Sequence, residues 1–436
     1  MTMAADKQDK VLNFSSEREQ SGACSSSAER EKNQGKNFLN VPTLRFPEYS
    51  DKWLECELQD IADLSKGAGI SKDQLSETGE SCILYGELYT KYKSEVISNV
   101  VSKTNIESTN LVRSKANDVI IPSSGETAID ISTARCVPYD NILLGGDLNI
   151  IRLKNQDGRF FSYQLNGVRK LDIAQIAQGV SVVHLYGESL KRLKVRYPSK
   201  SEQEKVSSLL SMIDERIETQ NRIIDKLQSL MKGLNDYLQD FVPLSYSLSF
   251  SDIGEDYSGL SGKSAEDFGS GKPYITYVSI YANNFVEDDC CGKVSVKRDE
   301  KQNVVQKGDM LFTLSSETPE EVCYGAVYSG NSTETYLNSF CFGVRNTEGK
   351  VFSPYMAYFF NSSRFRREVF PLAQGSTRFN LQKSDFLQKQ FSYPSIDDQH
   401  RIFKILYAYD NKLKVENQIL AHYQHQKEFL LRNLFI

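Results

Sequence analysis

Two long stretches of the chain carry apolar residues at heptad spacing. After Pro198, apolar residues recur every seven positions in two interleaved series that run to Leu238, and after Pro394 the same two series run to Leu434. A narrow seam of this kind is typical of a coiled coil, whereas a globular helix has a broader apolar stripe. The prolines end the preceding segments, so the pattern predicts helices that begin near residues 200 and 396. At about 38 residues each, these helices would be roughly 57 Å long.

The two seams are expected to pack against each other. Their polar breaks coincide, with Gln220 in one helix where Glu416 stands in the other, and a polar pair in a seam costs stability but fixes register. Lys427 also occupies a seam position, and we expect it to loosen that end of the pair. The alternative is two independent amphipathic helices, each packed on its own domain. The residues predicted to pair the helices are Val206, Leu210, Ile213, Ile217, Gln220, Ile224, Leu227, Ile402, Leu406, Tyr409, Leu413, Glu416, Leu420 and Tyr423.

The helices belong to an internal repeat. The tripeptide at 177–179, Ala-Gln-Gly, recurs at 373–375, and the same offset aligns Tyr-Pro-Ser at 197–199 with Tyr-Pro-Ser at 393–395 without a gap. Self-similarity at a fixed offset indicates one structural unit used twice. The chain is therefore two copies of a unit of about 190 residues, which are most alike at their helices.

The segments that surround the helices predict mixed α/β domains. Short apolar runs bounded by turn residues predict strands at 116–122, 142–153 and 304–314, and helical patterns occur at 354–360 and 364–370. The first residues are rich in Ser, Glu, Lys and Gln, which predicts a disordered tail. The predicted divisions are a tail at 1–37, a first domain at 38–197, a central helix at 198–241, a second domain at 242–393 and a distal helix at 394–436.

Composition narrows the function. No apolar stretch approaches the about 20 residues that span a bilayer, and no secretory signal is present, so we expect a cytoplasmic protein. The eight cysteines are scattered and the four histidines are not clustered, so we expect no metal site. No glycine-rich cofactor loop is found, because Gly262-Lys263-Ser264 lacks the first glycine of a P-loop. The chain shows no catalytic constellation, which favours a binding role without a cofactor of its own.

Basic residues and polar loops are candidate contacts to nucleic acid. Basic runs occupy 191–200 and 364–367, and Ser, Thr, Gln and Arg side chains in loops are the types that read base edges. Solvated loops without a ligand are the alternative, and a net charge of −5 argues against a large basic surface. The candidate DNA-binding residues are Lys66, Lys72, Tyr89, Lys91, Lys93, Ser123, Ser124, Thr127, Gln178, Lys263, Lys272, Tyr277, Ser315, Ser316, Thr318, Gln374, Ser376, Thr377 and Arg378.

The order of several short motifs resembles the specificity (S) subunits of type I restriction-modification systems. The sequence VPTLRFPEY at 41–49, with Trp53 and LQDI at 58–61, is similar to the opening of that family. The segments 197–234 and 393–435 resemble its central and distal conserved regions. The likeness covers residues 38–436, but DDQH at 397–400 departs from the Glu-Gln pair that is usual there.

The resemblance implies an α+β chain with an internal pseudo-two-fold repeat. Each globular segment would be a target recognition domain that reads one half of a bipartite, asymmetric site in double-stranded DNA. The long helices would pair antiparallel as a coiled-coil spacer and dock two modification subunits. Those subunits would bind S-adenosylmethionine and methylate adenine, and restriction subunits would add ATP- and Mg-dependent translocation and cleavage.

The chain itself would then be non-catalytic. Two rival classes stay open: an enzyme that acts alone on DNA, which the missing catalytic motifs argue against, and a coiled-coil scaffold for protein assembly that has no DNA role.

Overall fold

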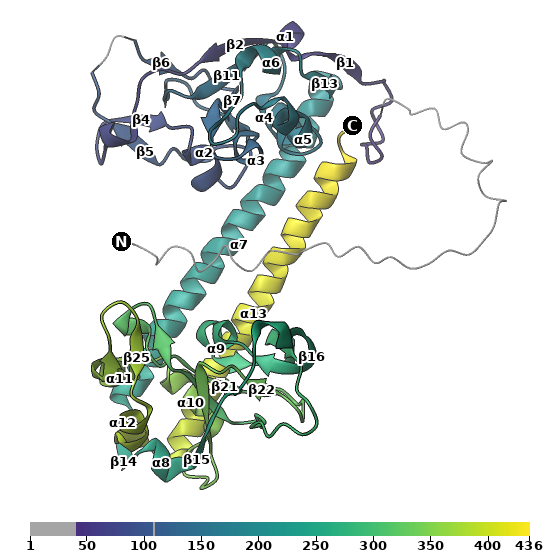
Figure 1. Ribbon diagram of the computed structural model, residues 1–436. Coiled ribbons are helices and arrows are strands. Elements are labelled where there is room, and N and C mark those ends of the chain that lie inside the picture. Colours follow the sequence, from purple (N-terminus) through teal and green to yellow (C-terminus); the bar gives the residue numbers. More distant parts are fainter. Residues whose placement is uncertain (1–40, 108–109) are drawn as a thin grey trace, which may run out of the picture.

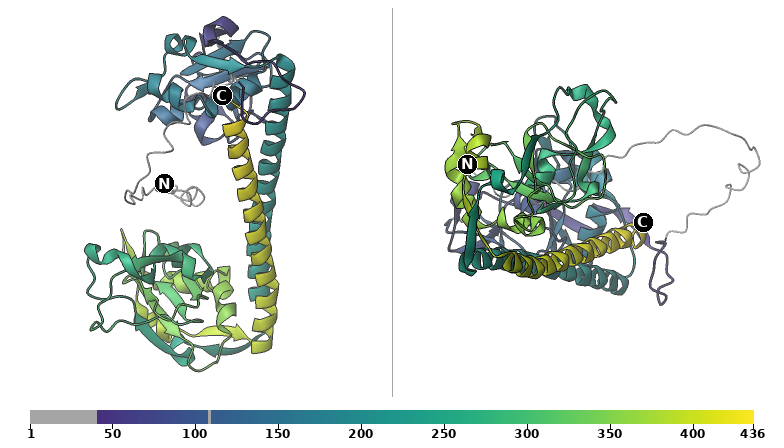
Figure 2. Two further views of the ribbon diagram at one scale, coloured as in Figure 1. Left: turned by 90° about the vertical axis from the view of Figure 1, so that its right-hand side faces the viewer. Right: turned by 90° about the horizontal axis from the view of Figure 1, so that it is seen from below.

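Two domains sit at opposite ends of a pair of long helices, and both project from the same side of that pair (Figures 1 and 2). The computed structural model describes residues 41–107 and 110–436, so the tail predicted at 1–37 lies outside the described residues. The long helices are α7 (Lys200–Phe241) and α13 (Ile396–Asn433), which begin where the Pro-Ser pairs predicted. They run antiparallel, because α7 leads from the first domain to the second and α13 leads back (Figure 1).

The first domain is built on an antiparallel sheet and a second, mixed sheet. The antiparallel sheet has the order β2 (Ala62–Lys66), β11 (Leu148–Leu153), β7 (Asp118–Pro122), β9 (Arg135–Val137). The mixed sheet has the order β3 (Leu75–Ser76), β5 (Ser102–Thr104), β4 (Glu80–Ile83), β10 (Leu143–Leu144), β6 (Val112–Arg113). The helices are α1 (Leu58–Ile61), α2 (Glu87–Thr90), α3 (Ala128–Ile131), α4 (Gly158–Asn166), α5 (Lys170–Ile176) and α6 (Gly187–Lys191).

The second domain repeats this arrangement. Its larger sheet has the order β15 (Glu255–Ser258), β23 (Cys341–Arg345), β19 (Met310–Thr313), β21 (Gly325–Tyr328), β17 (Phe285–Val286). A smaller sheet has the order β18 (Cys291–Val294), β16 (Phe268–Ile275), β22 (Tyr336–Leu337). The helices are α8 (Phe250–Ile253), α9 (Tyr277–Ala282), α10 (Ser353–Phe359), α11 (Ser363–Val369) and α12 (Lys383–Gln388).

Each domain closes by pairing its first strand with the strand that precedes a long helix. In the first domain β1 (Leu54–Glu57) pairs antiparallel with β13 (Lys194–Tyr197), and in the second β14 (Leu244–Leu248) pairs with β26 (Phe391–Pro394). The domain entrance and exit are thereby fixed beside each other, and the helix starts directly from the exit strand. This repeated closure confirms the tandem repeat that the sequence predicted.

The predicted strands are shorter than expected, for local reasons. Asn117, with φ of 79°, and Gly308, with φ of 90°, both turn the chain in the left-handed region, so the strands begin only at Asp118 and Met310. The run at 142–153 forms two strands, β10 and β11, because the chain turns between them at Gly146-Asp147, where Asp147 has φ of 59°. The apolar pattern identified the buried segments correctly, but it did not mark these turns.

A buried glutamine anchors each long helix to its domain. Gln203 is fully buried; its Oε1 accepts from the amide of Asp157 at 3.0 Å, and its Nε2 donates to the carbonyl of Pro198 at 2.9 Å. Gln399 does the same in the second domain, with the amide of Phe352 at 2.8 Å and the carbonyl of Pro394 at 3.0 Å. The glutamine of the DDQH segment therefore keeps the anchoring role, although its neighbours depart from the family pattern.

The segment at 41–50 ties the first domain to both long helices. Arg45 forms two hydrogen bonds of 2.8 Å with the buried carboxylate of Glu202 near the start of α7. The amide of Leu44 donates to the carbonyl of Asn433 at the end of α13, at 3.0 Å. A bidentate guanidinium–carboxylate pair is geometrically specific as well as strong. This part of the VPTLRFPEY motif therefore fixes how the two helix ends meet the first domain.

The seam residues serve both the helix pair and the domain cores. Near one end, Val206, Leu210 and Ile213 share a core with Leu430 and Leu434 and with the first domain; near the other, Ile402 and Leu406 belong to the core of the second domain. In between, Gln220 donates to Glu416 across the pair. Tyr409 is 38% exposed, so that seam position is only partly covered. Mutual pairing and packing on the domains, posed as alternatives, are thus both present.

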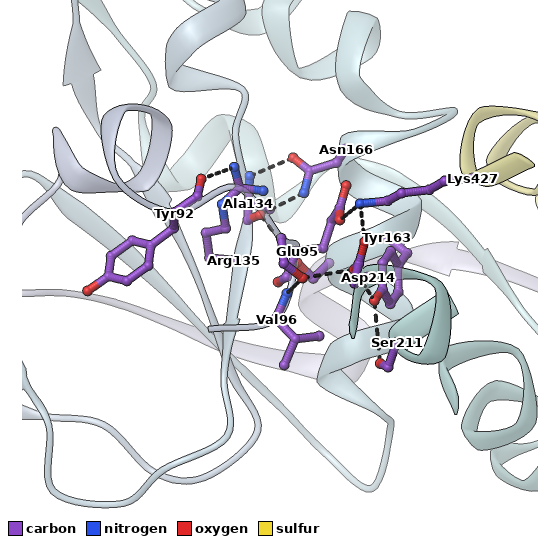
Figure 3. Close-up of polar contacts among 12 residues, drawn as sticks. Tyr92, Glu95, Val96, Ala134, Arg135, Tyr163, Asn166, Ser211, Asp214 and Lys427 are labelled. Carbon is purple, nitrogen blue, oxygen red and sulfur yellow. Dashed lines mark hydrogen bonds and ion pairs between the residues drawn. The ribbon is translucent and has the colours of Figure 1, made fainter. Parts of the chain in front are cut away.

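Lys427 is largely buried and paired at its end of the helix pair, where we expected it to loosen the pair. Its side chain is 14% exposed and lies between Glu95 of the first domain and Asp214 of α7, with Nζ 2.6 Å from Asp214 Oδ1 (Figure 3). Burial alone would lower the pKa of Lys427, but the two carboxylates raise it above its ordinary value. The charge is therefore compensated by partners that are distant in sequence.

Candidate nucleic-acid interface

The repeated Ala-Gln-Gly tripeptide forms the same tight turn in both domains. Gly179 has φ of 128° and Gly375 has φ of 133°, and a Cβ at either position would lie 2.1 Å from a carbonyl oxygen, that of Val182 or Arg378. Only glycine fits this conformation and this close approach. The turn presents residues 180–182 in the first domain and 376–378 in the second at an exposed tip.

Each turn is supported by a small sheet that contains the predicted serines. In the first domain β8 (Ser124–Gly125) pairs with β12 (Val183–His184). In the second, β20 (Ser315–Ser316) pairs with β25 (Phe379–Leu381), which pairs with β24 (Ala373–Gln374). Ser123, Ser124, Ser315 and Ser316 are all buried. The serines therefore form the base under the exposed tips, while Gln178, Gln374, Ser376 and Thr377 are exposed.

In the second domain the tip borders an open groove. Five of the candidate residues line it together: Ser315, Ser316, Thr377, Arg378 and Tyr277. The Tyr277 hydroxyl donates to the carbonyl of Ser315 at 2.7 Å, and Arg378 Nη2 lies 3.5 Å from Ser315 Oγ. A guanidinium on a groove rim can donate two parallel hydrogen bonds to a phosphate or to a guanine edge.

An aromatic ring beside Arg378 was not predicted. The guanidinium lies 5.7 Å from the centroid of Phe340, whose side chain is 56% exposed at the same groove. A ring that supports a cation in this way holds it in place and offers a stacking surface. An isolated exposed phenylalanine has no periodic signal, so the sequence alone could not have identified Phe340.

The corresponding surface of the first domain has different chemistry. His184 stacks on Tyr186 with ring centroids 6.1 Å apart, both rings are exposed, and Val180 at the tip is 98% exposed. Tyr89 on α2 lies beside this sheet, since a Cβ on Gly125 would be 3.8 Å from its hydroxyl, and burial raises the pKa of Tyr89. The same scaffold therefore carries an aromatic and aliphatic tip in one domain and a cationic tip in the other.

Thr127 and Thr318, two candidate DNA contacts, occupy equivalent places in the two domains, and each accepts a hydrogen bond within its own loop. Thr127 Oγ1 accepts from the amide of Asp130 at 3.1 Å and caps α3, while the carbonyl of Thr318 accepts from Ser316 Oγ at 2.5 Å. Both threonines remain exposed at the edge of their loop clusters.

Half of the candidate lysines are engaged with acidic groups. Lys91 lies 2.6 Å from Glu87 Oε1, Lys272 lies 2.7 Å from Glu334, and Lys263 is 4% exposed in an ion pair with Glu300. The Lys263 side chain is therefore buried and does not lie on the candidate DNA-contact surface. The other three, Lys66, Lys72 and Lys93, have exposed side chains.

The two basic runs are largely structural. Arg196 and Lys194 both pair with Glu55, and Lys191 pairs with Glu188. In the second domain Arg364 and Arg366 donate to backbone carbonyls, including that of Ser392 at 2.8 Å. Most of these basic side chains are therefore engaged within the chain, while those of Arg192 and Lys200 are exposed.

The part of the chain that the structure describes holds no group of acidic, cysteine or histidine side chains that could bind a metal, and none of its helices is both long and apolar enough to cross a membrane.

A family model for the type I restriction modification DNA specificity domain matches this chain twice, at residues 50–229 and 251–422. This chain belongs to the type I restriction-modification specificity subunits. The two matches coincide with the two copies of the repeat, each spanning one domain and most of the long helix that follows it.

Relatives and solved structures agree with this assignment. This specificity subunit is 22% identical over 408 residues to the type I restriction enzyme MjaVIII specificity subunit of Methanocaldococcus jannaschii, covering 88% of this chain and 91% of that protein. The crystal structure of the type I restriction-modification S subunit from M. genitalium matches with a TM-score of 0.57 and 16% identity, covering 91% and 99% of the two chains.

A chain from a structure of the assembly and conformational transition of a type I R-M system matches with a TM-score of 0.55 and 12% identity, over 88% of this chain and 97% of that one. At these identities the two structures show a shared fold.

Proposed function

We propose that this specificity subunit reads a bipartite, asymmetric site in double-stranded DNA, one half with each domain. The observation that carries this proposal is the pair of loop clusters: one scaffold, held by the same glycine turn, presents His184 and Tyr186 in one domain and Arg378 in the other. Two readers of one base sequence would have similar tips. Different tips on a repeated scaffold are expected where two different half-sites are read.

The antiparallel helix pair would set the distance between the half-sites. The domains project from one side of the pair, so both can face one duplex (Figure 2). At 1.5 Å per residue the 42 residues of α7 span roughly 63 Å. A helical spacer that holds two readers on one face of a duplex favours half-sites about one turn of DNA apart, on the order of 34 Å.

An apolar line along α7 is the proposed docking surface for modification subunits. Met212, Ile223, Leu230, Tyr237 and Phe241 are all exposed, and their spacings of eleven, seven, seven and four place them on one face of the helix. Exposed apolar side chains that share one helix face are typical of a protein contact. Leu230→Glu should weaken binding of the modification subunit, whereas Ser229→Glu on a neighbouring exposed position should not.

We propose that two modification subunits dock and that they, not this chain, supply S-adenosylmethionine chemistry at adenine, with ATP- and Mg-dependent steps on restriction subunits. The complex would act in the cytoplasm on DNA. The chain's net charge of −5 suits this division, because the modification subunits would make most phosphate contacts. The salt dependence of DNA affinity should therefore steepen when modification subunits are added; equal slopes would contradict this division.

The deciding experiment is co-expression with the modification subunit in a methylation-free host, followed by a genome-wide map of methylated adenine. A motif with two fixed halves and an unspecified gap is expected. Exchanging residues 38–197 for those of a relative should change one half only, and exchanging 242–393 the other. If a stable complex with an active modification subunit gave no methylation, or if changes in the loop clusters left the motif unaltered, a scaffold without a DNA role would be the better explanation.

A further inference from the structure

The long helices cross at a polar pair that lies on the pseudo-two-fold axis. Gln220 and Glu416 are 196 positions apart, the offset of the repeat, so each is the counterpart of the other. Gln220 Nε2 donates to Glu416 Oε2 at 2.6 Å and to the Glu416 carbonyl at 3.0 Å, and Lys412 lies 3.2 Å from Oε1. Because the pair is on the axis, two copies of one helix would place identical side chains opposite each other.

Away from the axis, a buried ion triad joins the second half of the chain to the first. Lys427 of α13 inserts between Glu95 and Asp214, whose side chains are 10% and 9% exposed (Figure 3). The other oxygen of Asp214 accepts from the hydroxyls of Tyr163 at 2.7 Å and Ser94 at 2.8 Å. Both oxygens of Asp214 therefore have partners, and Lys427 is the cation that forms ion pairs with the two buried carboxylates.

The equivalent junction of the second domain has no such triad. Asp410 takes the place of Asp214 and accepts from the Tyr358 hydroxyl at 2.7 Å. Asn284 takes the place of Glu95. Its backbone carbonyl accepts a hydrogen bond from an amide of β21, just as the carbonyl of Glu95 accepts one from an amide of β9, and its side chain donates to Asp410. Met231 stands where the repeat offset places the counterpart of Lys427, and it packs against the apolar core. One carboxylate replaces two, and an apolar side chain replaces the cation.

Both differences disfavour pairing between like halves, taking residues 41–241 as the first half and 242–436 as the second. Two first halves would present Met231 in place of Lys427, so Glu95 and Asp214 would be buried without their ion-pair partner at both junctions. Two second halves would place Glu416 against Glu416 on the axis. An unpaired buried charge and like charges in a helix seam are both strongly unfavourable.

We propose that the axial pair Gln220–Glu416 and the triad Glu95–Asp214–Lys427 form a pairing code, by which each half of the chain associates with the other half and rejects a copy of itself. The partner that the first half accepts is a helix with a carboxylate at the axis and a lysine eleven residues further on. The code keeps two different domains in one molecule, and copies of the protein do not exchange halves to give symmetric assemblies. This inference stands whether or not the domains read DNA.

Thermal unfolding of the full-length protein tests the energetic part of the code. Q220E mimics the axis of two second halves, and K427M mimics the junction of two first halves; each should lower the unfolding midpoint by at least about 4 °C. The partner changes should restore it, in Q220E/E416Q and in K427M/E95N. The exposed controls Q418E and K404M should shift it by about 1 °C or less. Double variants that stay as unstable as the single variants would overturn the code.

Exchange between cleaved chains tests selectivity directly. A protease site is inserted after Pro243, in the exposed connection between α7 and β14, and is cut in the folded full-length protein. The two halves are then separated in urea and diluted together. Native mass spectrometry measures the masses of the pairs that form. Mixed pairs should exceed like pairs at least about tenfold. The variant E95N/E416Q/K427M removes both charge conflicts, and its uncut form should unfold near the wild-type temperature. In this variant, like pairs should increase at least about fivefold. The same distribution for both proteins would overturn the proposal.

Discussion

Replacing the buried anchor glutamine of one domain should destabilise that domain alone. Gln203 makes three hydrogen bonds, to the Asp157 amide, the Pro198 carbonyl and Gln156 Oε1, at 2.7–3.0 Å. Gln203→Met keeps the length of the side chain, so little cavity forms, but two buried backbone groups lose their partner. At about 1–3 kcal/mol for each unsatisfied group, the domain should lose about 2–6 kcal/mol.

The single tryptophan offers a specific assay. Trp53 is 2% exposed in the core of the first domain and packs on Phe160, so its fluorescence reports unfolding of this domain. With a urea dependence of about 2 kcal/mol/M, the loss corresponds to a midpoint lower by about 1–3 M. Gln399→Met removes the equivalent bonds in the second domain and should leave the Trp53 transition in place, while amide exchange in α10 accelerates.

Gln175→Met, at an exposed position of α5, is the matched control and should move neither signal. The reasoning is refuted if Gln203→Met shifts the Trp53 midpoint no more than this control does. It is also refuted if Gln399→Met shifts that midpoint as far as Gln203→Met, because the two cores would then unfold as one.

Three further predictions concern charge, recognition and spacing. Burial raises the pKa of Asp410 in the folded protein, so its stabilising contribution is present at acid pH and is lost as the pH rises through that raised value. Asp410→Asn should therefore stabilise the second domain by about 1 kcal/mol at neutral pH and flatten its pH dependence in urea titrations, whereas Asp214→Asn, which weakens the Lys427 triad, should destabilise the first. Arg378→Ala should weaken DNA binding by about 10- to 100-fold and relax only one half of the methylated motif, measured by affinity and by adenine mapping; relaxation of both halves would contradict the assignment. Inserting seven residues into both long helices adds about 10.5 Å, so the mapped gap between the half-sites should lengthen by about 3 base pairs while the halves stay the same, and an unchanged gap would show that the helices are not the spacer.

Local rules predicted the scaffold well. The Pro-Ser pairs at 198–199 and 394–395 marked the helix starts, because proline disfavours helix before it and serine favours a helix N-terminus. The coincidence of Gln220 and Glu416 in the two seams predicted a contact that the structure contains. Each of these signals is a short pattern whose physical cause is local or repeats at a fixed offset.

The chemistry of the surface could not be predicted in the same way. Lys427 looked like a defect in the seam because Glu95, its partner, lies 332 positions away in a loop without periodic pattern. The basic run before α7 looked like a phosphate-binding surface, but Glu55, brought in by the pairing of β1 with β13, neutralises part of it. Whether a charged side chain is paired or free to bind a ligand depends on its neighbours in the folded structure, and neither composition nor spacing specifies those neighbours.

The apolar end of α13 makes folding of the first domain dependent on the order of synthesis. Leu430, Leu434 and Phe435 complete its core, and the ring of Phe435 lies 5.1 Å from that of Phe160. At about 5–20 residues per second, these side chains emerge from the ribosome about 10–50 s after strand β13 has been made. During that interval the first domain exposes the apolar surface that α13 will cover, whereas the α7 residues that pack on the second core, such as Leu234 and Leu238, are made before that domain. Of the two domains, the one made first is therefore the one that finishes folding last, and it is the natural client of chaperones during translation.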